Sequence, residues 1–134
     1  MFRSRLAAAT VSAVLAAGAV VGIAPLALAA PATAASPCVN DLLAAQASNN
    51  DAITADQVGD TMTARTHNLS TTTSLGAAMN DCFGQPQIVG ANILTASGHN
   101  AGALLSNLVG ASSAALSSEL AAASAIDQAL ANAS

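Results

Sequence analysis

Cys38 and Cys82 are the only cysteines in the chain, so a disulfide within one molecule can form in a single way. Such a bond would close a loop of about 45 residues, which on the chain-entropy model stabilises a fold by roughly 4 kcal/mol. The spacing fits neither the Cys-X-X-Cys pattern of redox sites nor the short spacings of four-ligand zinc sites. We therefore predict a structural disulfide, provided that the chain reaches an oxidising compartment.

The first 29 residues have the pattern of a secretory signal peptide. Arg3 and Arg5 form a basic start, residues 6–23 are an apolar run, and residues 27–29 (Ala-Leu-Ala) offer a cleavage site. A second possible cut follows Ala34. A transmembrane anchor is the alternative, because the apolar run could nearly span a bilayer, but no basic stop-transfer cluster follows it. We predict that the segment is removed and that the protein is secreted to the extracellular space, without stable membrane insertion afterwards.

The remaining part is acidic and has the size of a single domain. All seven Asp and Glu residues lie beyond residue 29, Arg65 is the only arginine there, and the chain contains no lysine. Phosphate binding relies on clustered Lys and Arg, so nucleic acid is excluded as a partner. Residues 30–37 contain two prolines and no periodic apolar pattern. We predict a flexible leader over 30–37 and one helical domain over 38–134.

The composition of this domain favours helices over strands. The chain after residue 29 contains 26 alanines, the residue with the highest helix propensity, and Phe83 is its only aromatic residue. No long run alternates apolar and polar residues as a half-buried strand would. The prediction is an all-α fold, a small Ala-rich antiparallel bundle of three to four helices with one disulfide.

Two positions compete for the first turn, and the predicted disulfide decides between them. A turn near Gly59, with Asp60 capping the next helix, gives arms of about 19 and 22 residues, which match within one helical turn. A turn near Asn50 gives arms of about 11 and 28 residues, and the cysteines would miss each other by roughly 25 Å. The hairpin is therefore expected to turn near Gly59, although the Ser and Thr run at 70–74 could bend its second arm.

Glycine, proline and serine mark the remaining helix ends. Residues 84–86 (Gly-Gln-Pro) end the second helix and begin a third one, expected over 86–109. The weakest point of this third helix is at residues 97–100, which include a glycine. A break at 110–113, with a serine as N-cap, starts a fourth helix that ends near residue 132.

Large aliphatic residues at helical spacing define the expected buried faces. The side chains expected in the core are Val39, Leu42, Leu43, Ile53, Val58, Met62, Leu69, Met79, Phe83, Leu94, Leu105, Leu108, Leu116, Leu120, Ile126 and Leu130. This core is thin, and alanine and glycine at the contacts would let the helices approach closely. A second copy of the chain could bury what one copy leaves exposed.

His67 and His99 are the only histidines and hence the candidate ligands of a metal or haem. If the second helix folds back along the third, the two imidazoles lie about 4.5 Å apart in height and could ligate iron or another transition metal. The helical wheel, however, places both on the side opposite the aliphatic residues, as is typical of solvated histidines. We therefore assign no metal and no cofactor. An extracellular carrier of a small apolar or metal-containing ligand, such as haem, is kept as the alternative function.

The sequence motifs of common enzymes are missing. There is no Gly-X-Ser-X-Gly, no phosphate-binding loop with lysine and no His-Glu-X-X-His. We therefore predict no catalytic residues and a non-enzymatic role. The expected function is that of a small secreted protein that acts through contacts with a protein or cell-surface partner, with a homo-oligomer as one form.

Overall fold

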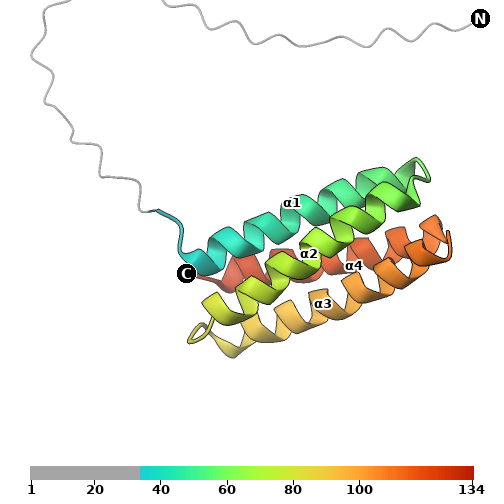
Figure 1. Ribbon diagram of the computed structural model, residues 1–134. Helices are drawn as coiled ribbons and strands as arrows, with labels where there is room; N and C mark the ends of the chain where they lie inside the picture. The colour runs from blue at the N-terminus through green and yellow to red at the C-terminus, as the bar shows by residue number, and fades with distance from the viewer. Residues whose placement is uncertain (1–33) are drawn as a thin grey trace, which may run out of the picture. The chain divides into compact units, whose positions relative to one another are not determined.

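Residues 34–134, which the structure describes in a computed structural model, form four α-helices. The predicted signal peptide, residues 1–29, and the first part of the predicted leader lie outside the described residues. The helices are, in chain order, α1 (Pro37–Gln57), α2 (Thr61–Asp81), α3 (Gln87–Leu108) and α4 (Ser112–Asn132) (Figure 1). The predicted all-α bundle is confirmed, with four helices and no strand between residues 34 and 134.

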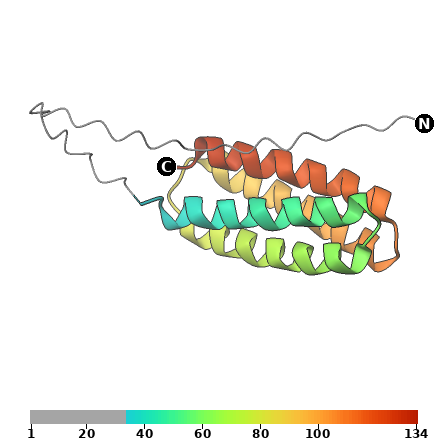
Figure 2. The same ribbon diagram turned by 90° about the horizontal axis from the view of Figure 1, so that it is seen from above.

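Each helix runs antiparallel to the next one and packs against two neighbours around the bundle. Helix α1 contacts α2 and α4, and α3 contacts the same two helices from the other side (Figure 2). The α1–α2 and α3–α4 loops lie together at one end, which we call the turn end. The α2–α3 loop, the start of α1 and the end of α4 lie at the opposite end, which we call the disulfide end. This up-down order follows from the short loops, which join antiparallel neighbours.

The first turn lies where the two cysteines require it. Helix α1 ends at Gln57, Gly59 has a φ of 77°, and the Asp60 carboxylate accepts a hydrogen bond of 3.1 Å from the Thr63 backbone N–H. A positive φ suits glycine because it has no Cβ, and an aspartate N-cap satisfies a free backbone donor of the helix. The predicted turn near Gly59 is confirmed.

The expected weak points of α2 and α3 are continuous helix. Along α2, the hydroxyls of Ser70, Thr71, Thr72 and Thr73 each donate a hydrogen bond to the carbonyl four residues earlier. These hydroxyl groups bond to carbonyls within the same helix, and the helix continues through the Ser and Thr run. Residues 97–100 likewise continue α3.

Three helix starts differ from the prediction. Helix α3 begins at Gln87, one residue later than expected, and Pro86 is its N-cap. Helix α1 begins at Pro37, one residue earlier than expected, because the Ser36 hydroxyl accepts a hydrogen bond from the Val39 N–H and caps the helix. The predicted serine cap of α4 is wrong. The N-cap is Ala111, which makes no side-chain hydrogen bond, and Ser112 is already helical.

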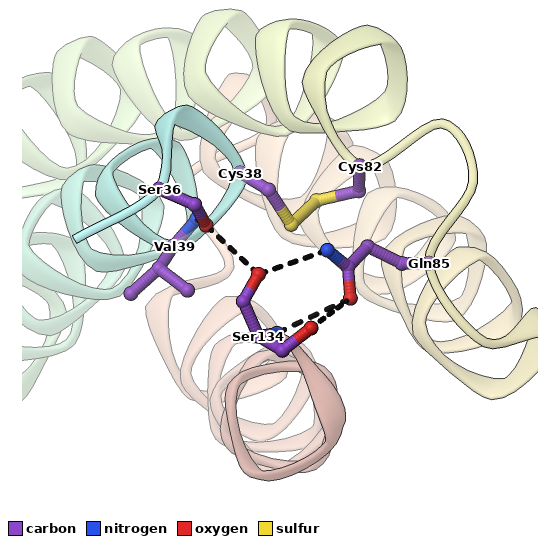
Figure 3. Close-up of a disulfide and its surroundings, with 6 residues drawn as sticks. All are labelled: Ser36, Cys38, Val39, Cys82, Gln85 and Ser134. Carbon is purple, nitrogen blue, oxygen red and sulfur yellow. Dashed lines mark hydrogen bonds between the residues drawn. A yellow bond between two sulfur atoms is a disulfide. The ribbon is translucent and has the colours of Figure 1, made fainter.

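The disulfide joins the first turn of α1 to the end of α2. The Sγ atoms of Cys38 and Cys82 are bonded and both residues are buried, which confirms the predicted pairing (Figure 3). Beside this bond, the Ser134 carbonyl accepts hydrogen bonds from the Ser36 hydroxyl at 3.1 Å and the Gln85 amide at 2.9 Å. The start of α1, the α2–α3 loop and Ser134, two residues after α4, are thus held together at the disulfide end.

Alanine occupies many of the buried positions along which the helices pack against one another, which we call the seam. The buried positions recur at alternating spacings of about three and four residues, as in a coiled coil, and alanine is among them in every helix. The fully buried alanines are Ala45, Ala52, Ala64, Ala78, Ala96, Ala103, Ala115, Ala122 and Ala129. Because an alanine side chain ends at Cβ, the helix backbones can approach closely.

Many of the large aliphatic residues expected in the core are exposed instead. Leu42 and Ile126 are buried as predicted, and Met79 and Leu130 pack at the edge of the core. Val39, Ile53 and Leu116 are half-buried. The exposed ones are Leu43, Val58, Met62, Leu69, Phe83, Leu94, Leu105, Leu108 and Leu120. The sequence prediction places the largest apolar residues of each helix at the centre of its buried face. In the structure, small side chains occupy most of the buried positions between the helices.

The second hairpin, α3–α4, repeats the first at a displacement of 51 residues. Both loops have the sequence Val-Gly, with a φ of 77° at Gly59 and 74° at Gly110. The buried positions correspond in pairs, which are Leu42 and Ile93, Ala45 and Ala96, Asn49 and Asn100, Ala52 and Ala103, Asp56 and Asn107, Ala64 and Ala115, Asn68 and Glu119, Leu75 and Ile126, and Ala78 and Ala129. The bundle is therefore pseudo-twofold symmetric in its sequence and in its core.

Candidate functional site

The core is mainly aliphatic in one half, where Asn92 is a buried polar exception, and polar in the other. Toward the disulfide end, the large buried side chains are Leu42, Leu75, Val89, Ile93 and Ile126. Toward the turn end, the corresponding seam positions hold six polar residues, which we call the polar cluster: Asn49, Asp56, Asn68, Asn100, Asn107 and Glu119. Burial of polar groups costs free energy unless they are hydrogen-bonded, so this half of the core is the feature that most needs an explanation.

Four side chains, one from each helix, form the centre of the polar cluster. The Asn107 amide of α3 donates to Asp56 Oδ2 of α1 at 2.9 Å. The Asn68 amide of α2 donates to Glu119 Oε1 of α4, also at 2.9 Å. Asp56 and Asn107 also lie close enough to the Glu119 carboxyl group to shift its pKa, so the two hydrogen-bonded pairs are neighbours in the core.

Two further amides tie this centre to the helix backbones. Asn49 donates to the Glu119 backbone carbonyl at 3.0 Å, and Asn100 donates to the Asn68 carbonyl at 2.9 Å. The two bonds are related by the pseudo-twofold symmetry. Asn100 also donates to Thr72 Oγ1 at 2.8 Å, which fixes the register of α3 against α2.

The polar cluster leaves six of its oxygen atoms without a hydrogen-bond partner. One buried oxygen in each of its six side chains lacks a hydrogen-bond partner within the described chain: Asn49 Oδ1, Asp56 Oδ1, Asn68 Oδ1, Asn100 Oδ1, Asn107 Oδ1 and Glu119 Oε2. No cationic side chain belongs to the cluster, and Arg65 is exposed on α2. Two carboxyl groups therefore lie inside the bundle without a basic partner.

The Glu119 carboxyl group responds to this environment. Its side chain is fully buried, and burial is the main cause that raises its pKa from 4.5 to about 7. The neighbouring Asp56 carboxyl group raises this pKa further, whereas the hydrogen bond from Asn68 and the nearby Asn107 amide lower it. A pKa of about 7 places the change in protonation of Glu119 near neutral pH, well above that of an exposed glutamate.

The two histidines have different surroundings, and no contact joins them. His67 is one-third exposed and its Nδ1 lies 3.8 Å from Asp51 Oδ2 of α1, so the imidazole is directed to α1 rather than α3. His99 is exposed on α3. Between residues 34 and 134, no three His, Cys, Asp or Glu side chains form a group that could hold a metal ion. The carrier function that would use His67 and His99 stays a prediction.

A sequence signal for the polar cluster exists in the spacing of its members. Asn49 and Asp56, like Asn100 and Asn107, lie seven residues apart, which places each pair on one side of a helix. Helical-wheel reasoning assigns polar residues to the solvent side, so the sequence prediction missed these six residues. Their repetition after 51 residues is the second signal.

A second candidate site is an exposed apolar surface at the turn end. It consists of Val58, Met62, Leu105, Leu108 and Val109, which we call the turn-end patch. Val58, Met62 and Val109 are 79%, 78% and 80% exposed. All five lie in or within about one helical turn of the two loops at this end, and exposed apolar patches are typical of interaction surfaces.

Comparisons with protein-family models, curated proteins and solved structures give no match to this chain. Within residues 34–134, no helix combines the length and the apolar character needed to cross a membrane. No pocket opens in this part of the chain either.

Proposed function

We propose that this protein is a secreted, non-catalytic binding protein that associates with a second copy of itself through the turn-end patch. The observation that carries the proposal is the placement of large and small apolar residues. Alanine occupies the seam, while valine, leucine and methionine side chains remain exposed where both tight loops end. Their burial against a partner would gain about 25 cal/mol for each Å² of apolar surface removed from water.

The position of these residues supports one continuous surface. Because Asn100 bonds to both Asn68 and Thr72, residues near 108 of α3 lie at about the height of Met62 on α2. The two loops also lie at the same end of the bundle (Figure 1, Figure 2). Met62 and Leu108 are therefore neighbours in height on adjacent helices.

Charge supports a second copy as the partner. Residues 100–118, which include most of the patch, contain no ionisable side chain. The α3–α4 side of this end would therefore add no like-charge repulsion between two acidic chains, whereas Asp60, an exposed acid between Val58 and Met62 in the α1–α2 loop, is a charge that the two copies would have to keep apart. The disulfide fits an extracellular protein, because such bonds persist in oxidising compartments.

Sedimentation equilibrium over a wide concentration range tests the proposal. We expect the wild-type protein to form dimers, and a Met62→Ser, Val109→Ser double variant to remain monomeric with an unchanged far-UV circular dichroism spectrum. The matched control is Leu43→Ser, Leu94→Ser, which removes two exposed leucines away from the turn end. A wild-type protein that stays monomeric, or a control that abolishes association equally, would overturn the proposal.

A further inference from the structure

We propose that the outer face of helices α2 and α3 binds an acidic amphipathic helix of a partner protein. This surface, which we call the α2–α3 face, consists of Arg65, Leu69, Met79, Leu94 and Leu104. It shares no residue with the turn-end patch, so a partner helix bound here and a second copy bound at the turn end are separate interactions.

The packing of α2 against α3 defines this face. Asn100 of α3 donates hydrogen bonds to the Asn68 carbonyl and to Thr72 Oγ1, so the side of α2 that carries Thr72 lies beside α3. Arg65 and Met79 lie seven residues before and after Thr72, on the same side of α2. Their levels are separated by about 21 Å at the rise of an α-helix, so a docked helix of about 14 residues would cover the face.

Two exposed leucines lie on this face at successive levels. Leu69 and Leu94 are 51% and 62% exposed, and the hydrogen bonds of Asn100 place Leu94 about one heptad beyond Leu69 along the bundle. Leu69 lies level with the exposed Ala101, and Leu94 lies level with Gly76, where an added Cβ would meet no atom. Each level therefore combines a leucine with a small residue, and apolar side chains at positions i and i+7 of a docked helix would contact both leucines.

Arg65 determines the charge expected of the partner. It is the only lysine or arginine between residues 34 and 134, it is exposed, and no acid in this part of the chain forms an ion pair with it. Helix α3 contains no Asp or Glu, and Asp81, the one acid of α2, lies beside Asp41 of α1. An unpaired guanidinium group beside an apolar surface without acids is complementary to a helix that carries both leucines and a carboxylate.

The internal repeat supplies an equivalent face with a different charge on the other side of the bundle, between α4 and α1. The corresponding residues of the two faces, 51 positions apart, are Leu69 and Leu120, Leu43 and Leu94, Arg65 and Leu116, and Gly76 and Asp127. Both faces therefore present exposed leucines, but the α4–α1 face carries an exposed acid, and α1 and α4 contain no basic residue. An acidic helix would be repelled there and attracted to the α2–α3 face.

Other occupants match this charge pattern less well. A neutral apolar helix would leave Arg65 without a partner. An anionic membrane surface would attract Arg65 but repel the seven acids of the chain. In a twofold dimer through this face, both copies would bring the same cation and no acid to the interface. An acidic amphipathic helix contacts the leucines and also pairs with Arg65.

The test is selection by the disulfide-intact protein from a displayed library of amphipathic helices of about 18 residues, long enough to cover the face. The library keeps leucine at the apolar positions and varies the flanking positions among Glu, Lys and Ser. We expect helices with flanking Glu to be enriched. In calorimetric titrations they should bind one per chain with a Kd in the micromolar range, and more weakly at high salt.

Variants with matched controls locate the binding surface. Leu69→Ser, Leu94→Ser should weaken binding about tenfold or more, and Arg65→Gln should weaken it about threefold or more and reduce its salt dependence. The repeat-equivalent pair, Leu43→Ser, Leu120→Ser, should leave the Kd unchanged, because its leucines have similar exposure on the other face. All these residues are exposed, so the variants should keep the wild-type circular dichroism spectrum.

Several results would contradict this assignment. They are the enrichment of no helix, the enrichment of Lys-flanked helices, an equal loss of affinity in both leucine pairs, and an unchanged affinity in Arg65→Gln. Co-sedimentation of the protein with phosphatidylglycerol vesicles that Arg65→Gln abolishes would identify a membrane as the occupant instead. The turn-end variant Met62→Ser, Val109→Ser should still bind the selected helices, and a loss of binding there would place the helix site at the turn-end patch.

Discussion

Asn68 donates a hydrogen bond of 2.9 Å to Glu119 across the centre of the bundle, and the two residues hold equivalent positions in successive hairpins. Asp56 and Asn107 are related in the same way. In each pair one member is a carboxyl group and the other is an amide. Two carboxylates in one pair would repel each other, whereas an amide supplies a donor for the acceptor opposite. The two hairpins therefore place polar side chains at equivalent positions, but one member of each pair is a carboxyl group and the other is a neutral amide.

The first prediction concerns the pH dependence of stability. Burial raises the pKa of Glu119 to about 7 from 4.5, so between these values the folded state binds more protons than the unfolded state. The free energy of unfolding should therefore fall as pH rises from about 4.5 to 7, by up to about 3 kcal/mol, and level off above pH 7. Glu119→Gln should remove most of this slope, because glutamine does not titrate.

Urea unfolding at pH 5 and pH 8, followed by circular dichroism, measures this slope. Asp60 supplies no competing slope, because the hydrogen bond from Thr63 lowers the pKa of its carboxyl group and it stays ionised at both pH values. An equal slope in wild type and Glu119→Gln would contradict the assignment to Glu119.

The second prediction compares two glycines. Gly59→Ala should destabilise the protein by about 1–2 kcal/mol, because φ at this position is 77° and a Cβ is strained there. Gly98→Ala should stabilise it by up to about 1 kcal/mol, because Gly98 is exposed within α3 and a Cβ would meet no atom. Urea midpoints of the two variants should move in opposite directions. A shift of the same sign in both would contradict the helix and turn assignments.

The third prediction concerns the disulfide. Cys38→Ser, Cys82→Ser removes a link between positions 44 residues apart. The free energy of unfolding should fall by about 4 kcal/mol on the chain-entropy model. Guanidinium unfolding of the variant and of the reduced wild-type protein should give the same loss. The second hairpin has Val89 and Ala133 at the equivalent positions and needs no such bond to pack, so a folded but less stable variant is expected.

How far the sequence predicts this fold depends on which residues carry the information. The cysteines fix the lengths of two arms, and Gly59, Gly84 and Gly110 mark loops whose backbones only glycine adopts easily. The hydrophobic pattern does not predict which face of each helix is buried, because alanine contributes little to that pattern. Buried Asn and Glu residues occupy seam positions, and leucines such as Leu94 are exposed. A helical wheel weighted by hydrophobicity therefore assigns the wrong face of the helix to the core.

The last prediction tests the alanine seam directly. Ala52 is fully buried between Asn49 and Asp56 of the polar cluster, whereas Ala47 is exposed on the same helix. Ala52→Leu inserts three carbon atoms into a closely packed seam and should lower the free energy of unfolding by about 1–3 kcal/mol. Ala47→Leu should change it by less than about 0.5 kcal/mol, because leucine and alanine have similar helix propensities on an exposed face. Urea unfolding measures both changes. If Ala52→Leu were as stable as the wild type, the helices would not be in close contact at this level, and the four central side chains could not reach one another.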